Sequence, residues 1–208
     1  MFFRSIISSV VCALVLMGWG YFYWVVIHPP GGGMLPLPRE EGLSMFFLET
    51  IPSSGVYVFP SIKGESPKDD GHDMEDYQAR HSLGPTGILM FSREGSDPYS
   101  YEKLLRGFLQ YFTASLLAAL LLIFTEQHLL GFFRRWLVVL LLGVFTVASI
   151  RMGDAIWWNH PFDYMVQLSI FSLTQWAVGG VVLALLVRPS RRMRVSDQSL
   201  PLWKRARY

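Results

Sequence analysis

The sequence is poor in cysteine and in charged residues, and it lacks the motifs of the commonest enzyme classes. Cys12 is the only cysteine in 208 residues, which excludes an internal disulfide bond. A single thiol within an apolar run is usually a small apolar side chain. The chain has no glycine-rich phosphate loop and no recognisable nucleophile arrangement of serine, cysteine and histidine. These absences argue against an ATP-driven pump and against a conventional hydrolase.

The sequence has few charged residues and several long apolar segments. Charged residues make up 16% of the chain, against roughly 25% in an average soluble domain. A membrane-spanning helix needs about 20 predominantly apolar residues. Four segments meet that length, namely residues 1–28, 104–124, 136–158 and 164–187. The predicted fold class is therefore an all-α polytopic membrane protein with four transmembrane helices and a small extracytoplasmic α+β cap.

The first apolar run has the features of a retained anchor. It ends in the aromatic run Trp19–Trp24 instead of the small-x-small cleavage site of a signal peptide. We therefore expect transmembrane helix 1, residues 1–28, to remain attached to the chain.

The distribution of charge predicts the orientation. Basic residues mark the N-terminus, the loop 125–135 and the tail 188–208, whereas residues 29–103 carry 12 of the 16 acidic residues. Basic residues favour the cytoplasmic side of a membrane. We therefore expect a multi-pass protein with both termini cytoplasmic, and with the cap (residues 29–103) and the hairpin 159–163 facing outward.

The cap contains signals for one helix and two strands. Glu40–Ile51 has helical spacing of apolar residues, and Gly55–Pro60 and Gly87–Ser92 alternate like strands. An isolated hairpin is marginal in water, so we expect the strands to pair and the helix to cover one face. The acidic segment Lys63–Ser82, with a helical turn at Asp73–Arg80, is expected to be locally mobile and dispensable for folding.

The stretch Arg151–Tyr164 predicts the tight outward turn between the last two spans. It contains Trp157 and Trp158, which we expect to act with Trp24 as anchors at the membrane interface. Asn159-His160-Pro161 then ends the helix, because proline cannot continue the hydrogen-bond ladder.

Polar residues near the outer ends of three spans form the candidate ligand site. In the intramembrane region charged residues tend to pair or to face a cavity. One interpretation is a polar vestibule for a small solute, a lipid head group or a quinone; the other, which we favour, is an internal ion pair with arginines that lock the helices together. The residues are Arg106, Gln110, Arg151, Asp154, Asp163 and Gln167.

No metal site or cofactor is predicted. The acidic stretch Asp69–Asp76 matches neither the calcium-loop nor the zinc spacing. His28, His160 and Asp163 are a weaker combination, since each histidine also sits beside a proline at a helix end.

The basic tail is expected to fix the topology or to bind anionic membrane lipid. Nothing else in the chain favours nucleic-acid binding. The tail residues that would contact lipid are Arg188, Arg191, Arg192 and Arg194.

Three stretches together resemble a group of bacterial multi-span inner-membrane proteins that has no assigned reaction. They are Ser54–Pro60, Gly84–Leu89 and Trp157–Tyr164, so the resemblance touches about half the chain. It implies a bacterial origin and the inner membrane, and adds nothing on mechanism.

The sequence thus favours a non-enzymatic membrane protein, an accessory or scaffold subunit that contacts other membrane protein subunits. Small residues at spacing four on the second and fourth spans, such as Ala114 with Ala118 and Gly180 with Ala184, are expected to form docking seams. The alternative function is small-molecule, lipid or quinone binding in the polar vestibule. A membrane enzyme has no motif to support it.

Overall fold

A computed structural model of the chain describes residues 2–28, 34–62, 72–125 and 131–187, and 74% of these described residues are helical. The chain divides into two compact units. The helical unit consists of Met1–Met34, Pro98–Gly153 and Pro161–Tyr208. The second unit consists of Leu35–Asp97 together with the turn Asp154–His160.

Within the described ranges, four helices are long and apolar enough to cross a membrane, which agrees with the predicted number of spans. The third begins at Phe132 and so includes Arg134 and Arg135, which the sequence analysis placed in a loop. The four helices are built from α1 (Phe2–Tyr21) continued by the π-helix η1 (Phe22–Ile27), α4 (Tyr101–Phe124), α5 (Phe132–Thr146) continued by the π-helix η2 (Val147–Arg151) and α6 (Met152–Trp157), and α7 (Phe162–Leu186).

Local signals set the ends of these helices. The Ser100 hydroxyl accepts a hydrogen bond from the backbone N–H of Lys103 and caps the N-terminus of α4. Asn159 has a left-handed backbone with φ of 51°, a conformation that asparagine tolerates better than most residues. Pro161 follows and precedes α7, so the predicted helix break lies where the sequence places it.

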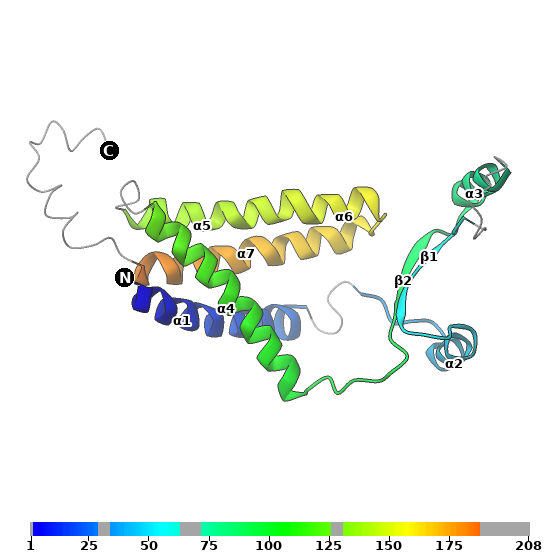
Figure 1. Cartoon of the computed structure of the whole chain (residues 1–208), viewed down its shortest axis with the longest axis horizontal. Helices are drawn as coiled ribbons and strands as arrows, with labels where there is room; N and C mark the ends of the chain where they lie inside the picture. Colours follow the sequence, from blue (N-terminus) through cyan, green and yellow to red (C-terminus); the bar gives the residue numbers. More distant parts are fainter. Residues whose placement is uncertain (1, 29–33, 63–71, 126–130, 188–208) are drawn as a thin grey trace, which may run out of the picture. The chain divides into compact units, whose positions relative to one another are not determined.

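Small residues let the helices of the helical unit approach closely. α7 packs against both α5 and α1, and α4 packs on α1 (Figure 1). A Cβ atom added at Gly143 would lie 2.7 Å from the Trp176 Cβ, and one added at Gly180 would lie 3.1 Å from the Trp136 ring. The core between the helices contains Cys12, Leu16, Ala118, Ala119, Leu122, Val139, Leu183 and Val187.

Three of the four small residues predicted as docking seams are buried between helices of this chain, and the fourth, Ala114, is half-buried. Ala118, Gly180 and Ala184 are buried, and Gly180 contacts Trp136 of α5. Neighbouring helices of the same chain therefore occupy these residues, and they do not offer a seam to another subunit.

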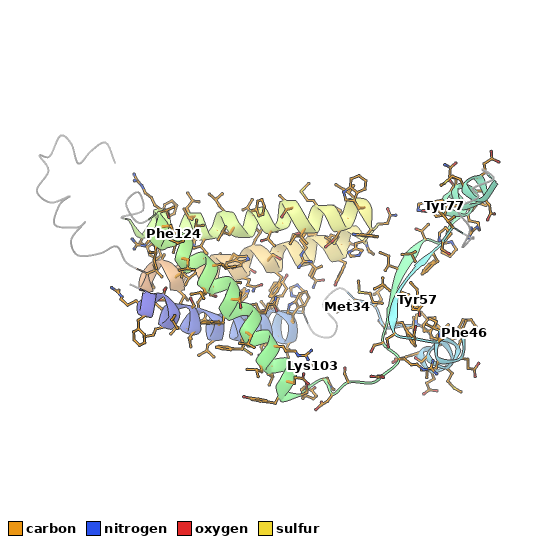
Figure 2. All side chains as sticks on the ribbon, viewed as in Figure 1. Met34, Phe46, Tyr57, Tyr77, Lys103 and Phe124 are labelled. Carbon is orange, nitrogen blue, oxygen red and sulfur yellow. The ribbon has the colours of Figure 1, made fainter. Side chains whose placement is uncertain are left out.

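The second unit contains the predicted helix and strands. They are α2 (Glu40–Thr50), β1 (Gly55–Phe59) and β2 (Gly87–Phe91), and the strands pair antiparallel with Val56 opposite Met90 and Val58 opposite Ile88. The Phe47 and Phe91 rings lie 6.3 Å apart, so α2 contacts the end of the sheet at which Gly55 pairs with Phe91. Cover of a whole face of the sheet by α2 stays a prediction. Figure 2 labels Phe46 on α2 and Tyr57 on β1.

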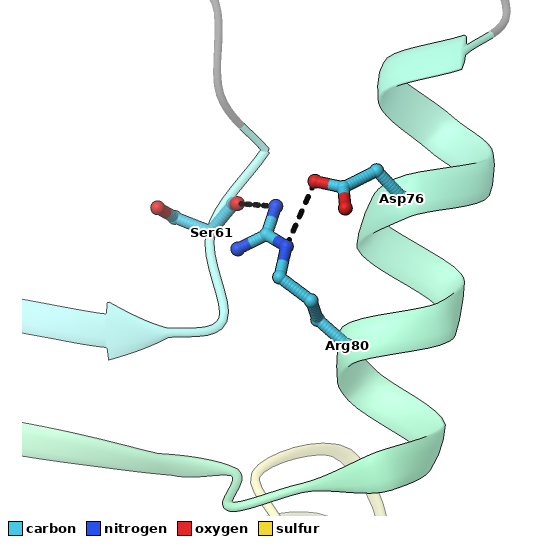
Figure 3. A network of polar contacts seen from close by, with 3 residues as sticks. All are labelled: Ser61, Asp76 and Arg80. Atoms are coloured by element: carbon cyan, nitrogen blue, oxygen red, sulfur yellow. Dashed lines mark hydrogen bonds and ion pairs between the residues drawn. The ribbon is translucent and has the colours of Figure 1, made fainter.

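The acidic segment contains the helix α3 (His72–Leu83), which includes the helical turn predicted at Asp73–Arg80. Residues 63–71 lie outside the described part of the chain. Asp76 and Arg80 form an ion pair one turn apart, and Arg80 also donates a hydrogen bond to the Ser61 carbonyl (Figure 3). Such pairs stabilise a helix, and the hydrogen bond to Ser61 connects α3 to the end of β1.

Candidate functional site

Two arginines donate hydrogen bonds to backbone carbonyls at the C-terminal end of α7. Arg135 is only 7% exposed, and its Nε and Nη2 atoms donate hydrogen bonds of 3.2 and 3.0 Å to the Ala184 carbonyl. Arg4 donates to the Leu186 carbonyl. The last four carbonyls of a helix have no partner within it, and the helix dipole favours positive charge there. Arg4 and Arg135 therefore connect the starts of α1 and α5 to the end of α7.

Other polar side chains of the helical unit also bind backbone carbonyls of a neighbouring helix. The Trp136 Nε1 donates to the Ala177 carbonyl at 3.0 Å, the Tyr23 hydroxyl to the Gln167 carbonyl at 3.1 Å, and the Cys12 Sγ to the Gly179 carbonyl at 3.7 Å. These contacts hold helices together. The polar groups of Trp136, Tyr23 and Cys12 therefore serve as contacts between helices.

Two of the four long helices contain π-helical turns. η1 ends just before His28, and η2 ends at Arg151. Such turns are rare and frequently occur at functional sites. Around η1, the Tyr23 ring lies 4.5 Å from the His28 ring and 5.0 Å from the Phe171 ring, so side chains of the same chain fill the space beside this turn.

The six residues of the predicted vestibule do not gather in one place. Arg106 pairs with Glu102 one turn earlier on α4, and both side chains are well exposed; Gln110 is exposed as well. α4 diverges from α5 and α7 toward its start, near Lys103 (Figure 2). Asp163 is exposed in the first turn of α7.

The remaining three residues of that set are half-buried. Arg151 ends η2, which packs against α7, the helix that carries Gln167. Asp154 lies in the first turn of α6, and its backbone carbonyl accepts hydrogen bonds from the N–H groups of Trp158 and His160. The geometry therefore places Arg151 and Gln167 on neighbouring helices and leaves Arg106 and Gln110 elsewhere.

The predicted interfacial anchors differ in their surroundings. The Trp24 ring packs 5.1 Å from the Phe171 ring, whereas Trp157 and Trp158 are exposed. The predicted lipid-binding arginines of the tail lie outside the described residues.

No metal centre is assembled in the described ranges. Among those residues, no group of three or more His, Cys, Asp or Glu side chains lies close enough together to hold an ion. Asp69 and Asp70 of the acidic stretch lie outside these ranges.

The second unit presents an apolar sheet face to its surroundings. We use the term docking face for Val56, Val58, Ile88 and Met90, which lie opposite one another in two cross-strand pairs. Val56 is 67% exposed and Met90 is 75% exposed. Because side chains alternate along a strand, these four residues lie on the face opposite Phe91, the residue whose ring contacts α2.

α2 adds to this exposed apolar surface. None of its residues is buried, although Met45, Phe46 and Leu48 are large and apolar. A helix with apolar residues on all sides is normally buried. The spacing of Leu43, Phe46 and Phe47 predicts one apolar side of the helix, the side expected to face the sheet. It does not predict the exposed apolar residues of α2 or the docking face.

No protein-family model, curated protein or solved structure matches this chain.

Proposed function

We propose that this protein is a non-enzymatic bacterial inner-membrane protein that crosses the membrane four times and serves as an accessory or scaffold subunit of a larger complex. The docking face of the second unit is the observation that carries this proposal. Contiguous exposed apolar patches mark interaction sites in proteins. A second protein that covers Val56, Val58, Ile88 and Met90 would remove this apolar surface from water.

The polar contacts of the helical unit support a structural role. Arg135, Trp136 and Tyr23 donate hydrogen bonds to carbonyls of neighbouring helices, and such contacts hold a bundle together. The position of Arg4 and Arg135 at the end of α7 also supports the proposed orientation, because it places positive charge at the end expected to face the cytoplasm.

Photo-crosslinking in native membranes tests this function. A photoreactive amino acid at Val56 or Met90 should form a discrete adduct with one other membrane protein. The same group at Gln78, an exposed residue of α3, serves as the matched control and should not form this adduct. Val56→Asp combined with Met90→Asp should abolish the adduct and release the chain from the complex on a native gel. Adducts with lipid alone, or equal adducts from all three positions, would reject the proposal.

The end of η2 favours a second function, the binding of a small molecule, lipid or quinone. A π-helical turn that ends at a half-buried arginine, packed on the helix that carries Gln167, is the specific observation. An arginine at such a position offers several N–H donors to an oxygen-rich ligand.

Native mass spectrometry of the purified protein tests this second function. A ligand held by Arg151 should be observed on the wild-type chain and lost from Arg151→Met, while the thermal unfolding of the variant stays cooperative. Arg106→Met, which alters the exposed arginine of α4, is the control and should retain the ligand. An unchanged ligand in Arg151→Met would eliminate this site.

A further inference from the structure

The second unit contains a cavity of about 210 Å³ at the α3 end of its sheet. The ends of β1 and β2 form its floor, α3 supplies one wall, and the turn Asp154–His160 of the same unit supplies the other. Side chains from these three sources that can contact a ligand are Tyr77, His81, Thr86, Trp157, Trp158 and Asn159.

A contact outside the cavity holds the α3 wall in place against the end of β1. Arg80 donates a hydrogen bond of 2.9 Å to the Ser61 carbonyl and pairs with Asp76 (Figure 3), which fixes α3 beside the end of β1. Tyr77 and His81 lie one turn apart on α3 with ring centroids 5.7 Å apart. They therefore line the cavity from the same side of the helix.

A glycine shapes the floor of the cavity. The Phe59 ring lies across Gly87 of the paired strand, so that a Cβ atom added at Gly87 would be 2.6 Å from the Phe59 Cζ. Any larger residue at position 87 would push this ring away. Gly87 therefore gives the Phe59 ring room at the edge of the cavity, which both residues line.

The chemistry of the lining selects an uncharged ligand. Of the described residues that line the cavity, none is lysine, arginine, aspartate or glutamate. Four polar groups remain, on Tyr77, His81, Thr86 and Asn159, and within the described ranges they make no hydrogen bond to another residue. Together they offer both donors and acceptors.

The aromatic walls select a ring with an apolar face. Trp157 and Trp158 are 78% and 55% exposed, so each indole has free surface to stack against. Tryptophan combines a large apolar ring with one donor. The cavity is smaller than the roughly 300 Å³ at which sites for drug-sized ligands begin, so it suits a single ring.

We propose that this cavity binds one uncharged sugar unit of a saccharide. A sugar ring stacks the C–H face on an indole while its hydroxyl groups donate and accept hydrogen bonds at the edge. A quinone ring offers acceptors only and would leave the acceptors of Asn159 and His81 unmatched. The cavity thus gives the second unit a ligand of its own, in addition to the protein partner proposed for the docking face.

Ligand-observed NMR with the full-length chain tests the proposal, in a detergent whose head group contains no sugar. The probes are maltose, cellobiose and di-N-acetylchitobiose. At least one of them should show saturable binding. Trp157→Ala and Trp158→Ala should each weaken that binding by about twofold to twelvefold, the effect of losing one aromatic contact of ~0.5–1.5 kcal/mol.

Two further variants keep the test independent of folding. Asn159→Gly removes the amide but tolerates the left-handed backbone, and Thr86→Val removes one hydroxyl with little change of shape; both should weaken binding while thermal unfolding stays unchanged. Phe162→Ala is the matched control, because Phe162 is as exposed as Trp157 and does not line the cavity, and it should bind normally.

Three results would overturn the proposal: no saturable binding of any of the three saccharides, binding that survives all four cavity variants, or tighter binding of a soluble benzoquinone at the same residues. Val58 and Ile88 of the docking face also line the cavity, whereas Val56 and Met90 do not. The crosslinking test uses only Val56 and Met90, so it succeeds or fails separately from this one.

Discussion

The helical unit and the second unit differ in where they place their apolar side chains. In the helical unit, Leu16, Leu122 and Leu183 are fully buried between helices. In the second unit, none of the described side chains is buried, and large apolar residues such as Met90 remain exposed. A small domain needs a core to be stable alone. The helical unit therefore completes its packing internally, whereas the second unit needs another surface to complete its own.

The two units nevertheless fasten helix ends in the same way. Arg135 binds the Ala184 carbonyl at the end of α7, and Arg93 binds the Leu48 and Ile51 carbonyls at the end of α2 at 2.7 and 2.9 Å. Arg135 is buried and Arg93 is exposed. Because water competes for exposed donors and acceptors, the same contact should contribute more to stability in the helical unit.

The largest effect is expected from the loss of Arg135. Arg135→Leu should lower the free energy of unfolding in detergent by about 1.5–3 kcal/mol, the range for hydrogen bonds to a charged group. Arg135→Lys should recover part of the loss, since an ammonium group can reach the carbonyl without the planar fork of arginine. Arg134→Leu is the control, because Arg134 is exposed. Equal free energies of unfolding for the Arg134→Leu and Arg135→Leu variants would show that the buried contact of Arg135 does not stabilise the helical unit.

Close packing between α5 and α7 gives the next effect. Gly143→Ala should destabilise the helical unit by about 1–3 kcal/mol, because the new methyl group would overlap the Trp176 Cβ. Gly18→Ala is the matched control. Nothing lies within 4 Å of a Cβ added at Gly18, so that variant should be unchanged or stabilised by up to about 1 kcal/mol. Chemical unfolding in micelles, followed by helicity, separates the two.

A smaller and local effect is expected for Arg93. Arg93→Ala should destabilise α2 by about 1 kcal/mol or less, since both hydrogen bonds are exposed to solvent. Hydrogen exchange should become faster in α2 and stay the same in α5 and α7. A loss of protection that spread into the helical unit would contradict the separation of the two units.

The parts of the fold that depend on pattern within one segment were predictable from the sequence. Long apolar runs predicted the four helices, alternation at Val56 and Val58 predicted a strand, and Pro161 predicted the break before α7. The limits of these elements differ by a few residues, as at Phe132, because the apolar count does not include the arginines that begin α5.

The features that depend on contacts between segments were missed. Arg135 was assigned to a loop, because its position beside the end of α7 follows from the antiparallel packing of α5 and α7. The helical turn predicted at Asp73–Arg80 lies in α3, but the hydrogen bond of Arg80 to the Ser61 carbonyl follows from the tertiary structure and has no signal in this segment. The π-helical turns have no signal in the sequence. The vestibule was predicted from the similar depth of its six residues in the membrane, and depth carries no information on the divergence of α4 from its neighbours.

Cysteine accessibility at the docking face tests the central claim most directly. In a Cys12→Ala background, Val56→Cys and Met90→Cys should resist a membrane-impermeant maleimide in native membranes. Both should react quickly once the purified chain is placed in lipid nanodiscs, where lipid is present and the partner is absent. Gln78→Cys should react in both settings. Rapid reaction at Val56→Cys and Met90→Cys in native membranes would show that nothing covers the docking face, and would contradict the proposed subunit role.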